Sequence, residues 1–157
     1  MNINGWTEQN CELRQQMLSA MKADIICISE THLNGDSIIY LPNYVWCGFN
    51  REMRHVRAPI THGGVGMFIK TSLLDDFSFS VIDKSFDGIL GVKFQHNVSC
   101  FEMIVYSVYL PPESNHWGRD ASAFFNHLLT SLYSYADTES IIIGGDFNGR
   151  IGNLDDY

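Results

Sequence analysis

Positive charge is scarce in this sequence. Its 157 residues include 10 lysines and arginines against 18 aspartates and glutamates, a formal net charge of −8. Nucleic-acid affinity rests largely on lysine and arginine, so this balance argues against a general polyanion-binding protein. Residues 50 to 70 are the exception, with four basic side chains, one acid and a local net charge of +3; the basic residues are Arg51, Arg54, Arg57 and Lys70. This segment is a candidate phosphate-facing surface, although a solvated loop explains it at least as well.

Long hydrophobic runs and a signal peptide are also missing. The longest apolar runs fall well short of the roughly 20 residues of a membrane-spanning helix, and the N-terminus has no basic-then-apolar leader. We therefore expect no membrane association and a soluble intracellular protein, in the nucleus or the cytoplasm and not secreted.

Cysteine is sparse as well. Cys11, Cys27, Cys47 and Cys100 show no close pairing, and Cys27 lies inside an apolar run. Reduced thiols are therefore favoured over a disulfide framework or a zinc site. What is present suits one domain over residues 1–157, because apolar residues make up 45% of the chain and aromatic residues 13%, enough for a core.

The segment from Ser140 to Gly149 combines a strand signal with polar side chains. Three consecutive isoleucines predict a strand buried on both faces that leaves the core at Gly144 and Gly145. Asp146 and Asn148 follow at the carboxyl end of this strand, which is where open α/β sheets bind ligands. Aspartate and asparagine beside glycine are also common turn formers, so this segment alone leaves both interpretations open.

Hydrophobic periodicity predicts the other elements. Residues 2–4 and 24–29 form parallel strands joined by a helix from Thr7 or Asn10 to about Met21, which buries Leu13, Met17, Leu18, Ala20 and Met21. Further strands cover residues 44–49, 63–70, 77–83, 88–95 and 101–109, with 77–83 and 88–95 as an antiparallel hairpin. A second helix begins at Asp120, and its wide apolar face holds Phe124, Phe125, Leu128, Leu129, Leu132 and Tyr133.

Polar side chains follow several of these strands. Glu30, Tyr109 and Asp146 each stand at a strand end, and the parallel pairing brings Asn2 to the same edge as Glu30. Two carboxylates that converge repel each other unless a cation lies near them. Carboxylate and amide oxygens select a hard ion, so Mg²⁺ is the expected cofactor and Mn²⁺ an alternative. Asn2, Asn148 and Tyr109 are suited to holding a phosphodiester, while Asp146 or the metal positions the attacking water.

Four motifs carry a family resemblance. They are Asn2-Ile3-Asn4-Gly5, Ser29-Glu30-Thr31-His32-Leu33, Tyr109-Leu110-Pro111 and Gly145-Asp146-Phe147-Asn148. In this order and at these intervals they resemble the endonuclease/exonuclease/phosphatase superfamily. They resemble most the endonuclease domains of non-long-terminal-repeat retrotransposons, which are similar to apurinic/apyrimidinic endonucleases. The resemblance spans essentially the whole chain and implies a four-layer α/β/β/α sandwich of mixed sheets.

The resemblance also implies roles for single residues. Glu30 would be the metal ligand with Asn2 beside it, Tyr109 would contact the scissile phosphate, and Asp146 would align or deprotonate the water while Asn148 stabilises the phosphate. Asn4, Arg51, Arg54 and Arg57 are candidate substrate contacts. DNA, bound through its phosphate backbone, is the implied partner, and a reverse transcriptase domain would belong to a longer parent chain. His32 is expected to be structural, and His62 and His116 match no catalytic role.

The chain also departs from the family pattern. Family members continue past the Asp-x-Asn motif to another aspartate and an Asp-His pair near their end, whereas this sequence stops at Tyr157, and Asp155 and Asp156 lie too close to that motif to substitute. We therefore expect the C-terminal part of the fold to be missing and the nuclease to be impaired or inactive. Two alternatives stay open: a phosphomonoesterase or phospholipase-type member of the superfamily, and a non-enzymatic remnant that pairs with another chain through an exposed sheet edge.

Overall fold

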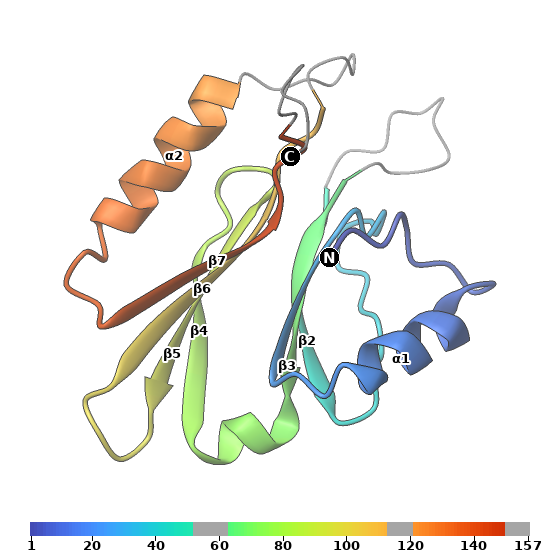
Figure 1. Cartoon of the computed structure of the whole chain (residues 1–157), viewed down its shortest axis with the longest axis horizontal. Helices are drawn as coiled ribbons and strands as arrows, with labels where there is room; N and C mark the ends of the chain where they lie inside the picture. The colour runs from blue at the N-terminus through green and yellow to red at the C-terminus, as the bar shows by residue number, and fades with distance from the viewer. Residues whose placement is uncertain (52–62, 113–120, 150–157) are drawn as a thin grey trace, which may run out of the picture.

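Two β-sheets packed face to face form the centre of the computed structural model, which describes residues 1–51, 63–112 and 121–149. One helix covers the outer face of each sheet, so the layers run α2, sheet, sheet, α1 (Figure 1). This is the predicted α/β/β/α sandwich. The elements in chain order are α1 (Cys11–Ala20), β1 (Ile25–Ser29), β2 (Tyr44–Phe49), β3 (Val65–Lys70), the 3₁₀ helix η1 (Thr71–Asp75), β4 (Phe77–Asp83), β5 (Ile89–His96), β6 (Glu102–Tyr109), α2 (Ala121–Tyr133) and β7 (Ser140–Asp146).

The first sheet has the strand order β1-β3-β2, and both of its pairings are antiparallel. The N-terminal segment joins it through a single parallel bridge between Asn2 and Ser29, where the Ile3 amide donates to the Ser29 carbonyl at 3.0 Å. The predicted parallel pairing is therefore confirmed, although it is one bridge and not a strand. It brings Asn2 beside the carboxyl end of β1.

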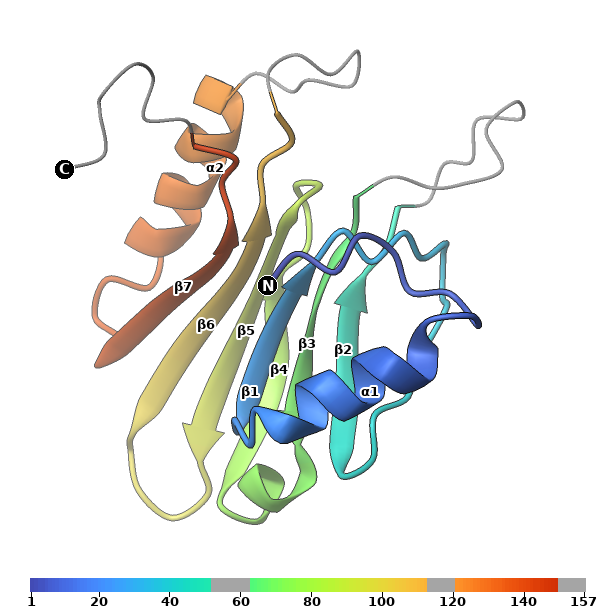
Figure 2. The same cartoon turned by 45° about the vertical axis from the view of Figure 1, so that its right-hand side comes forward.

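The second sheet has the order β4-β5-β6-β7 and is mixed. β4, β5 and β6 form antiparallel neighbours, which confirms the predicted hairpin, while β7 is parallel to β6 because α2 crosses over between them. β1 packs over β6 and β7, β3 over β5 and β6, and β2 over β5. Figure 2 shows the arrowheads of β1, β6 and β7 at the same end of the sandwich.

Side-chain alternation along the strands divides the core into three parts. Between the sheets, Met67 and Ile69 of β3 pack with residues of β5 such as Val92. The odd and even positions of a strand point to opposite faces, so Phe68 lies under α1 instead. Each fully buried aliphatic side chain of this kind contributes about 1.5–3 kcal/mol relative to an exposed one. A third cluster, which includes Tyr106 of β6, is covered by Phe124 of α2.

The strand at residues 140–146 differs from its prediction. Ile142 is 51% exposed and Ile143 40% exposed, so β7 is not buried on both faces. The reason is topological: in the described part of the chain β7 is an edge strand with β6 as its one neighbour. Gly144 and Gly145 also do not end the strand, which continues to Asp146.

The apolar faces predicted for the helices are wider than the buried ones. In α1 only Leu18 is buried, whereas Leu13 and Met17 are exposed, as is Met21 just beyond the helix. In α2 the buried residues are Phe124 and Leu128. Each helix contacts one sheet along a narrow stripe of residues. The hydrophobic periodicity of the sequence therefore predicts more buried helix residues than the structure has. The expected Asp120 cap lies outside the described residues.

The remaining expectations from composition concern thiols and membrane spans. All four cysteines are free thiols. No helix within the described ranges is both long and apolar enough to cross a membrane.

Candidate active site

Four of the sequence-predicted residues meet at one end of the sandwich. Glu30 directly follows β1, Tyr109 and Asp146 are the last residues of β6 and β7 and are paired in register, and Asn2 bridges to Ser29 next to Glu30. Two of these side chains come from the first sheet and two from the second. The gap between the sheets is therefore where they can meet.

Two hydrogen bonds close that gap. The Tyr109 hydroxyl of the second sheet donates to Glu30 Oε1 of the first. The Asn2 side-chain amide of the first sheet donates from Nδ2 to Asp146 Oδ2 of the second at 2.9 Å. Residues up to 144 positions apart in sequence thus form one cluster that contains two carboxylates.

Asp146 is held from several sides. Its Oδ1 accepts the Asn148 backbone N–H at 2.9 Å, while its Oδ2 accepts from Asn2. Asn2 is fixed in turn, because its Oδ1 accepts the backbone N–H of Asn4 at 3.0 Å. Asn148 uses its side chain elsewhere, donating from Nδ2 to the Leu110 carbonyl at 2.8 Å. The carboxylate therefore has a defined orientation before any substrate binds.

Tyr109 is a neutral donor in this environment. It is 5% exposed, and burial raises the pKa of its hydroxyl, as do the hydrogen bond to Glu30 and the negative charges of Glu30 and Asp146. The positive charge of Arg51 acts in the opposite direction on the same pKa and is outweighed. Both carboxylates and Arg51 thus lie close enough to act on one hydroxyl.

Left-handed backbone conformations are concentrated in this cluster. Asn4, Glu30, His32 and Asn148 have φ values of +47°, +54°, +57° and +45°. This conformation costs a non-glycine residue about 1–2 kcal/mol. Asparagine can offset part of that cost by hydrogen-bonding to the nearby backbone, whereas glutamate and histidine adopt the conformation less readily. Such strain persists only where surrounding contacts impose it, and it is typical of binding and catalytic sites.

His32 lies against the glutamate. Its Nε2 is 4.0 Å from Glu30 Oε2, and its ring packs on the backbone of Gly5, where a Cβ would come within 2.7 Å of His32 Nδ1. This close packing agrees with the structural role expected for the histidine. Gly5 has a φ of +83°, which a residue with a side chain rarely adopts.

The donor atoms of the cluster fit a hard divalent cation. Glu30, Asp146 and Asn2 supply carboxylate and amide oxygens, which Mg²⁺ and Mn²⁺ accept together with water. Residues 1–51, 63–112 and 121–149 contain no group of three or more histidines, cysteines, aspartates or glutamates that could hold a metal. Any ion here would therefore have few protein ligands and would take water in the remaining positions.

Comparison with protein families assigns the fold. The profile of the Endonuclease/Exonuclease/phosphatase family matches residues 1–154. The chain belongs to this family. A search of curated proteins gave no significant match.

Solved structures agree with this family on the fold. An AP endonuclease, LMAP from Leishmania major, superposes with a TM-score of 0.75 and 14% identity over 99% of this chain. A humanized D. rerio TDP2 gives 0.58 and 16% over 96%, and the human Nocturnin catalytic domain with bound sulfate gives 0.56 and 18% over 93%. The chain spans 56%, 61% and 59% of these three chains. At such identities the likeness shows a shared fold.

The basic residues of segment 50–70 lie only partly where a phosphate-facing surface would need them. Lys70 lies at the opposite end of β3 from Glu30 and pairs with Asp24 at 3.0 Å, so its assignment to a phosphate-facing surface is wrong. Arg51 does lie near the cluster and pairs through Nε with Asp87 Oδ2 at 2.7 Å. The candidate contacts Arg54 and Arg57 lie outside the described residues, as do His62 and His116.

Sequence patterns missed two acids. Asp87, between the two strands of the predicted hairpin, accepts a hydrogen bond from Arg51 Nε. Asp83 ends β4 and accepts a hydrogen bond at Oδ2 from His127 of α2, over 3.0 Å. Asp83 is the buried last residue of a strand that is otherwise exposed or half-buried, and no sequence pattern marks it.

Proposed function

We propose that this protein is a divalent-metal-dependent phosphodiester hydrolase that cleaves DNA in the manner of a retrotransposon-type endonuclease. The proposal rests on two hydrogen bonds between the sheets, Tyr109 to Glu30 and Asn2 to Asp146, which place both carboxylates at the same end of the sandwich. Two carboxylates brought together in this way repel each other, and a bound cation relieves that repulsion. Mg²⁺ suits the oxygen donors best, and Mn²⁺ would serve similarly.

Each side chain of the cluster has a part in such a reaction. Glu30 and Asn2 would hold the ion, which when bound supplies positive charge to the scissile phosphate. Asp146, oriented by Asn2 and the Asn148 amide, aligns the attacking water and takes its proton as the new P–O bond forms; the ester P–O bond breaks and the leaving oxygen takes a proton from solvent. Tyr109, kept protonated, donates to a phosphate oxygen, and so does the Asn148 side chain once it leaves the Leu110 carbonyl.

DNA is the substrate that the similar structures favour. They include an AP endonuclease, and a complex of D. rerio TDP2 with a single-strand DNA product resembles the chain with a TM-score of 0.50 and 11% identity. Arg51 and Asn4 border the cluster and are the proposed contacts to the rest of the DNA strand. A reverse transcriptase domain in a longer parent protein would match the retrotransposon-type motifs.

Nicking of supercoiled plasmid tests the proposal. With Mg²⁺ any conversion of supercoiled to open-circular DNA should be slow, in line with the impaired nuclease expected from the motifs; EDTA should abolish it, and Asp146→Asn should lower its rate by about 100-fold or more. Lys70→Ala removes a charge at the far end of β3 and should nick at the wild-type rate. Equal nicking by wild type and Asp146→Asn would contradict the assignment. Release of inorganic phosphate from inositol phosphates without nicking would instead identify a phosphomonoesterase.

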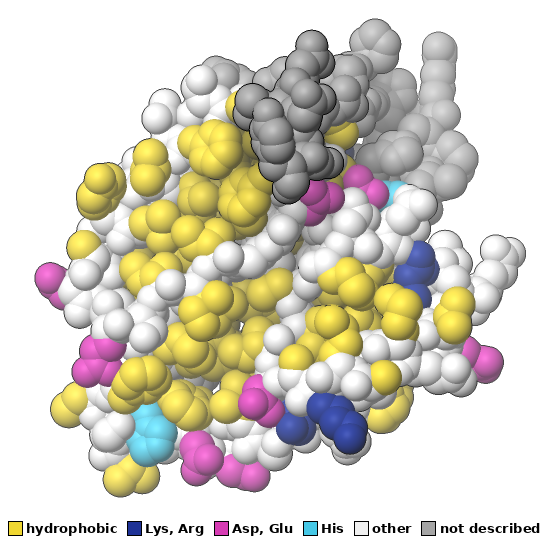
Figure 3. Space-filling view, viewed as in Figure 1, with side chains coloured by type: hydrophobic (Ala, Val, Ile, Leu, Met, Phe, Trp, Pro, Cys, Tyr) yellow, Lys and Arg dark blue, Asp and Glu magenta, His cyan; other side chains and the backbone are white. Residues whose placement is uncertain are grey.

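A second candidate function is an interaction module. Ile142 and Ile143 point to opposite faces of the edge strand β7 and are both exposed, as are Phe125 and Leu129 of α2. Figure 3 shows hydrophobic side chains gathered over this part of the molecule. A strand from another polypeptide could add to such an edge. Sedimentation velocity would detect this as association that Ile142→Lys abolishes, in a protein that neither binds Mg²⁺ nor nicks DNA.

A further inference from the structure

A second contact joins the two sheets beyond the Glu30 and Asp146 cluster. Arg51 follows β2 of the first sheet, and Asp87 lies in the loop between β4 and β5 of the second. Arg51 Nε and Asp87 Oδ2 are 2.7 Å apart, and the two side chains are only 20% and 18% exposed. An ion pair this well covered holds a more defined geometry than one on the open surface.

The guanidinium is held on its other side by backbone. Gly63, which precedes β3, has a φ of +87°, and a Cβ built on it would lie 3.1 Å from Arg51 Cζ and 3.3 Å from Nη2. Only a residue without a side chain leaves room for the planar group to lie there. The Gly63 carbonyl also accepts the His32 amide at 2.9 Å, so the same backbone contacts both Arg51 and the segment after Glu30.

The strand order places this pair on the same edge as the candidate site, but away from its centre. In the first sheet β3 lies between β1 and β2, so the backbone of Arg51 is two strand spacings, about 10 Å, from that of Glu30. In the second sheet the loop of Asp87 continues into Gly88, whose carbonyl accepts the Tyr109 amide at 2.8 Å. The polar groups thus form a row along the edge, from Asp146 and Asn2 to Arg51 and Asp87.

The chemistry of the pair suits an anion that is already bound nearby. Asp87 accepts a hydrogen bond from Arg51 Nε. Within the described part of the chain, the two Nη nitrogens of Arg51 make no hydrogen bond. Arginine presents five N–H donors in a fixed fork, so the Nη atoms retain the geometry that recognises phosphate. Asp87 cancels the charge of Arg51 at long range, so the pair contributes through its position and not through a broad positive field. A contribution through position is compatible with the net charge of −8, because it needs no broad positive surface.

We propose that Arg51, positioned by Asp87, binds a second phosphate of a nucleic-acid strand, adjacent to the one held at Glu30 and Asp146. The inference rests on the proposed hydrolase function and refines it. A polynucleotide places phosphates along the whole row, whereas a small diester or monoester occupies only the Glu30 end. Arg51 is then a substrate-specificity residue and Asp87 a positioning residue.

Two substrates separate this role from catalysis. One is a fluorescein-labelled DNA duplex, whose affinity is measured by anisotropy over a salt series with Ca²⁺ in place of Mg²⁺. The other is bis(p-nitrophenyl) phosphate, a diester with one phosphate, whose turnover is measured with Mg²⁺. We expect Arg51→Ala to weaken duplex binding about tenfold and to lower the salt slope by about one, with a clearly smaller loss of kcat/KM for the small diester.

Asp87 is tested through two substitutions. Asp87→Ala should weaken duplex binding about fivefold, because Arg51 loses its fixed position, and Asp87→Asn should restore most of it, because the amide oxygen still accepts from Nε. Lys70→Ala is the matched control, since it removes the same charge from an ion pair at the opposite end of β3. It should leave the affinity and the salt slope near their wild-type values.

Several outcomes would overturn the proposal. An unchanged salt slope in Arg51→Ala, even with a lower melting temperature, would make the pair purely structural. If Arg51→Ala lowered duplex affinity and small-diester turnover by the same factor, Arg51 would instead contact the scissile phosphate. Turnover of the small diester by a wild-type protein that does not bind the duplex would refute the second-phosphate site and leave the hydrolase assignment intact. Failure with both substrates would refute the hydrolase assignment itself.

Discussion

Ser29 and Ser107 carry two hydroxyls that are completely buried between the sheets, next to the candidate site. Ser29 is the last residue of β1 and faces the same side as Cys27. The Ser107 hydroxyl donates to the carbonyl oxygens of Gly66 at 3.2 Å and Ile28 at 3.4 Å. The Ser29 hydroxyl has no partner among the described residues. The two serines therefore differ in hydrogen bonding at equal burial.

This difference predicts opposite effects of the same substitution. Ser29→Ala removes a buried hydroxyl that gains nothing in the folded state, so the free energy of unfolding should rise by about 1 kcal/mol. Ser107→Ala is the matched control and should lower it by about 1 kcal/mol, because a buried hydrogen bond to the backbone carbonyls is lost. Urea unfolding of the variants measures both changes. Destabilisation by Ser29→Ala would instead show that its hydroxyl has a partner, such as a buried water.

At the scale of the element, β7 depends on one close backbone approach. A Cβ built on Gly145 would overlap the carbonyl oxygen of Val108 in the paired strand β6. On the neighbouring Gly144 it would meet only the Cys27 side chain, at 3.8–3.9 Å, which is ordinary van der Waals contact. The strand pairing that places Asp146 beside Tyr109 thus requires glycine at position 145 and not at 144.

Alanine substitutions of these two glycines should therefore differ sharply. Gly145→Ala should destabilise the protein by about 3 kcal/mol or more, because backbone atoms must move apart, whereas Gly144→Ala should change stability by less than about 1 kcal/mol. Thermal unfolding followed by circular dichroism provides the measurement. Similar melting temperatures for the two variants would contradict the register of β6 and β7.

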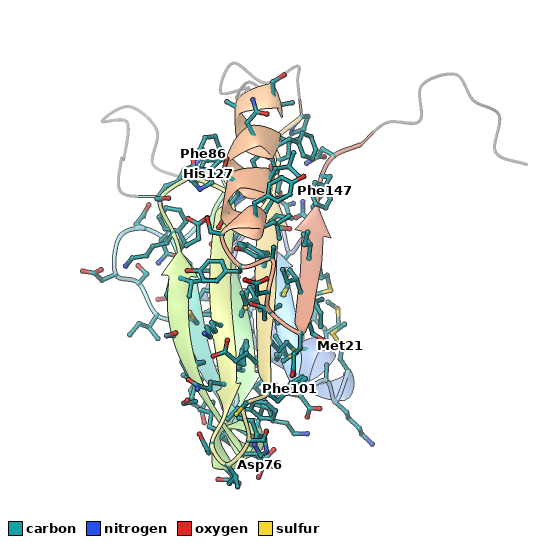
Figure 4. All side chains as sticks on the ribbon, turned by 90° about the vertical axis from the view of Figure 1, so that its left-hand side faces the viewer. Met21, Asp76, Phe86, Phe101, His127 and Phe147 are labelled. Carbon is teal, nitrogen blue, oxygen red and sulfur yellow. The ribbon has the colours of Figure 1, made fainter. Side chains whose placement is uncertain are left out.

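A buried carboxylate adds a polar contact to the apolar packing of α2 on the second sheet. His127 Nε2 lies 3.0 Å from Asp83 Oδ2, and the His127 ring stacks on Phe86 with centroids 5.0 Å apart (Figure 4). The Ser85 amide and hydroxyl donate to Asp83 Oδ1 at 3.1 and 2.9 Å. Burial opposes ionisation of Asp83, but hydrogen bonds from Ser131, Ser85 and His127 outweigh it and hold the pKa of Asp83 below its ordinary value.

A lowered pKa in the folded state gives a defined dependence of stability on pH. The ionised Asp83 stabilises the fold above the unfolded-state pKa of about 3.9, and this contribution is lost as pH falls below about 4 toward the folded-state pKa. Asp83→Asn should lower the free energy of unfolding by about 1–3 kcal/mol at pH 7. The gap between the two proteins should narrow in urea titrations below pH 4. A gap that is constant with pH would mean that Asp83 is not ionised in the fold.

Strand and helix positions are the part of this fold that hydrophobic periodicity predicts well. The strands at 44–49 and 77–83 have the predicted limits, since alternation and turn residues are local properties. Burial is predicted less well. Three isoleucines in a row favour a fully buried strand, yet exposure of Ile142 depends on whether β7 has a second neighbour, which no local pattern contains.

At the scale of the whole molecule, polar contacts join the two sheets in addition to their apolar core: the candidate site, the Arg51–Asp87 pair and the Ser107 hydroxyl. The sequence motifs predicted the members of the cluster, because each stands at a strand end. They did not predict the pairs Arg51–Asp87 and Asp83–His127, since both join segments that are more than 30 positions apart and carry no motif. Ion pairs of this kind follow from the packing of layers, which only the three-dimensional arrangement provides.

Under the proposed function, the same joining of sheets would couple folding to metal binding. Glu30→Gln removes one of the two negative charges at this end of the sandwich, while its amide oxygen still accepts from Tyr109. In EDTA, Glu30→Gln should therefore be as stable as the wild type or more so. With Mg²⁺, a ligand of the folded state, the wild type should gain about 2.7 kcal/mol at 100 times the dissociation constant, and the variant should gain little.

The melting temperatures of the two proteins should consequently change order as Mg²⁺ is added. Lys70→Ala keeps Glu30 and Asp146 and should follow the wild type at every concentration, which excludes general ionic effects on an acidic chain. Scanning calorimetry over a Mg²⁺ series, at constant ionic strength, measures the crossover. Parallel curves for wild type and Glu30→Gln would show that the two carboxylates do not share an ion, and the hydrogen-bonded cluster would then serve only to hold the sheets together.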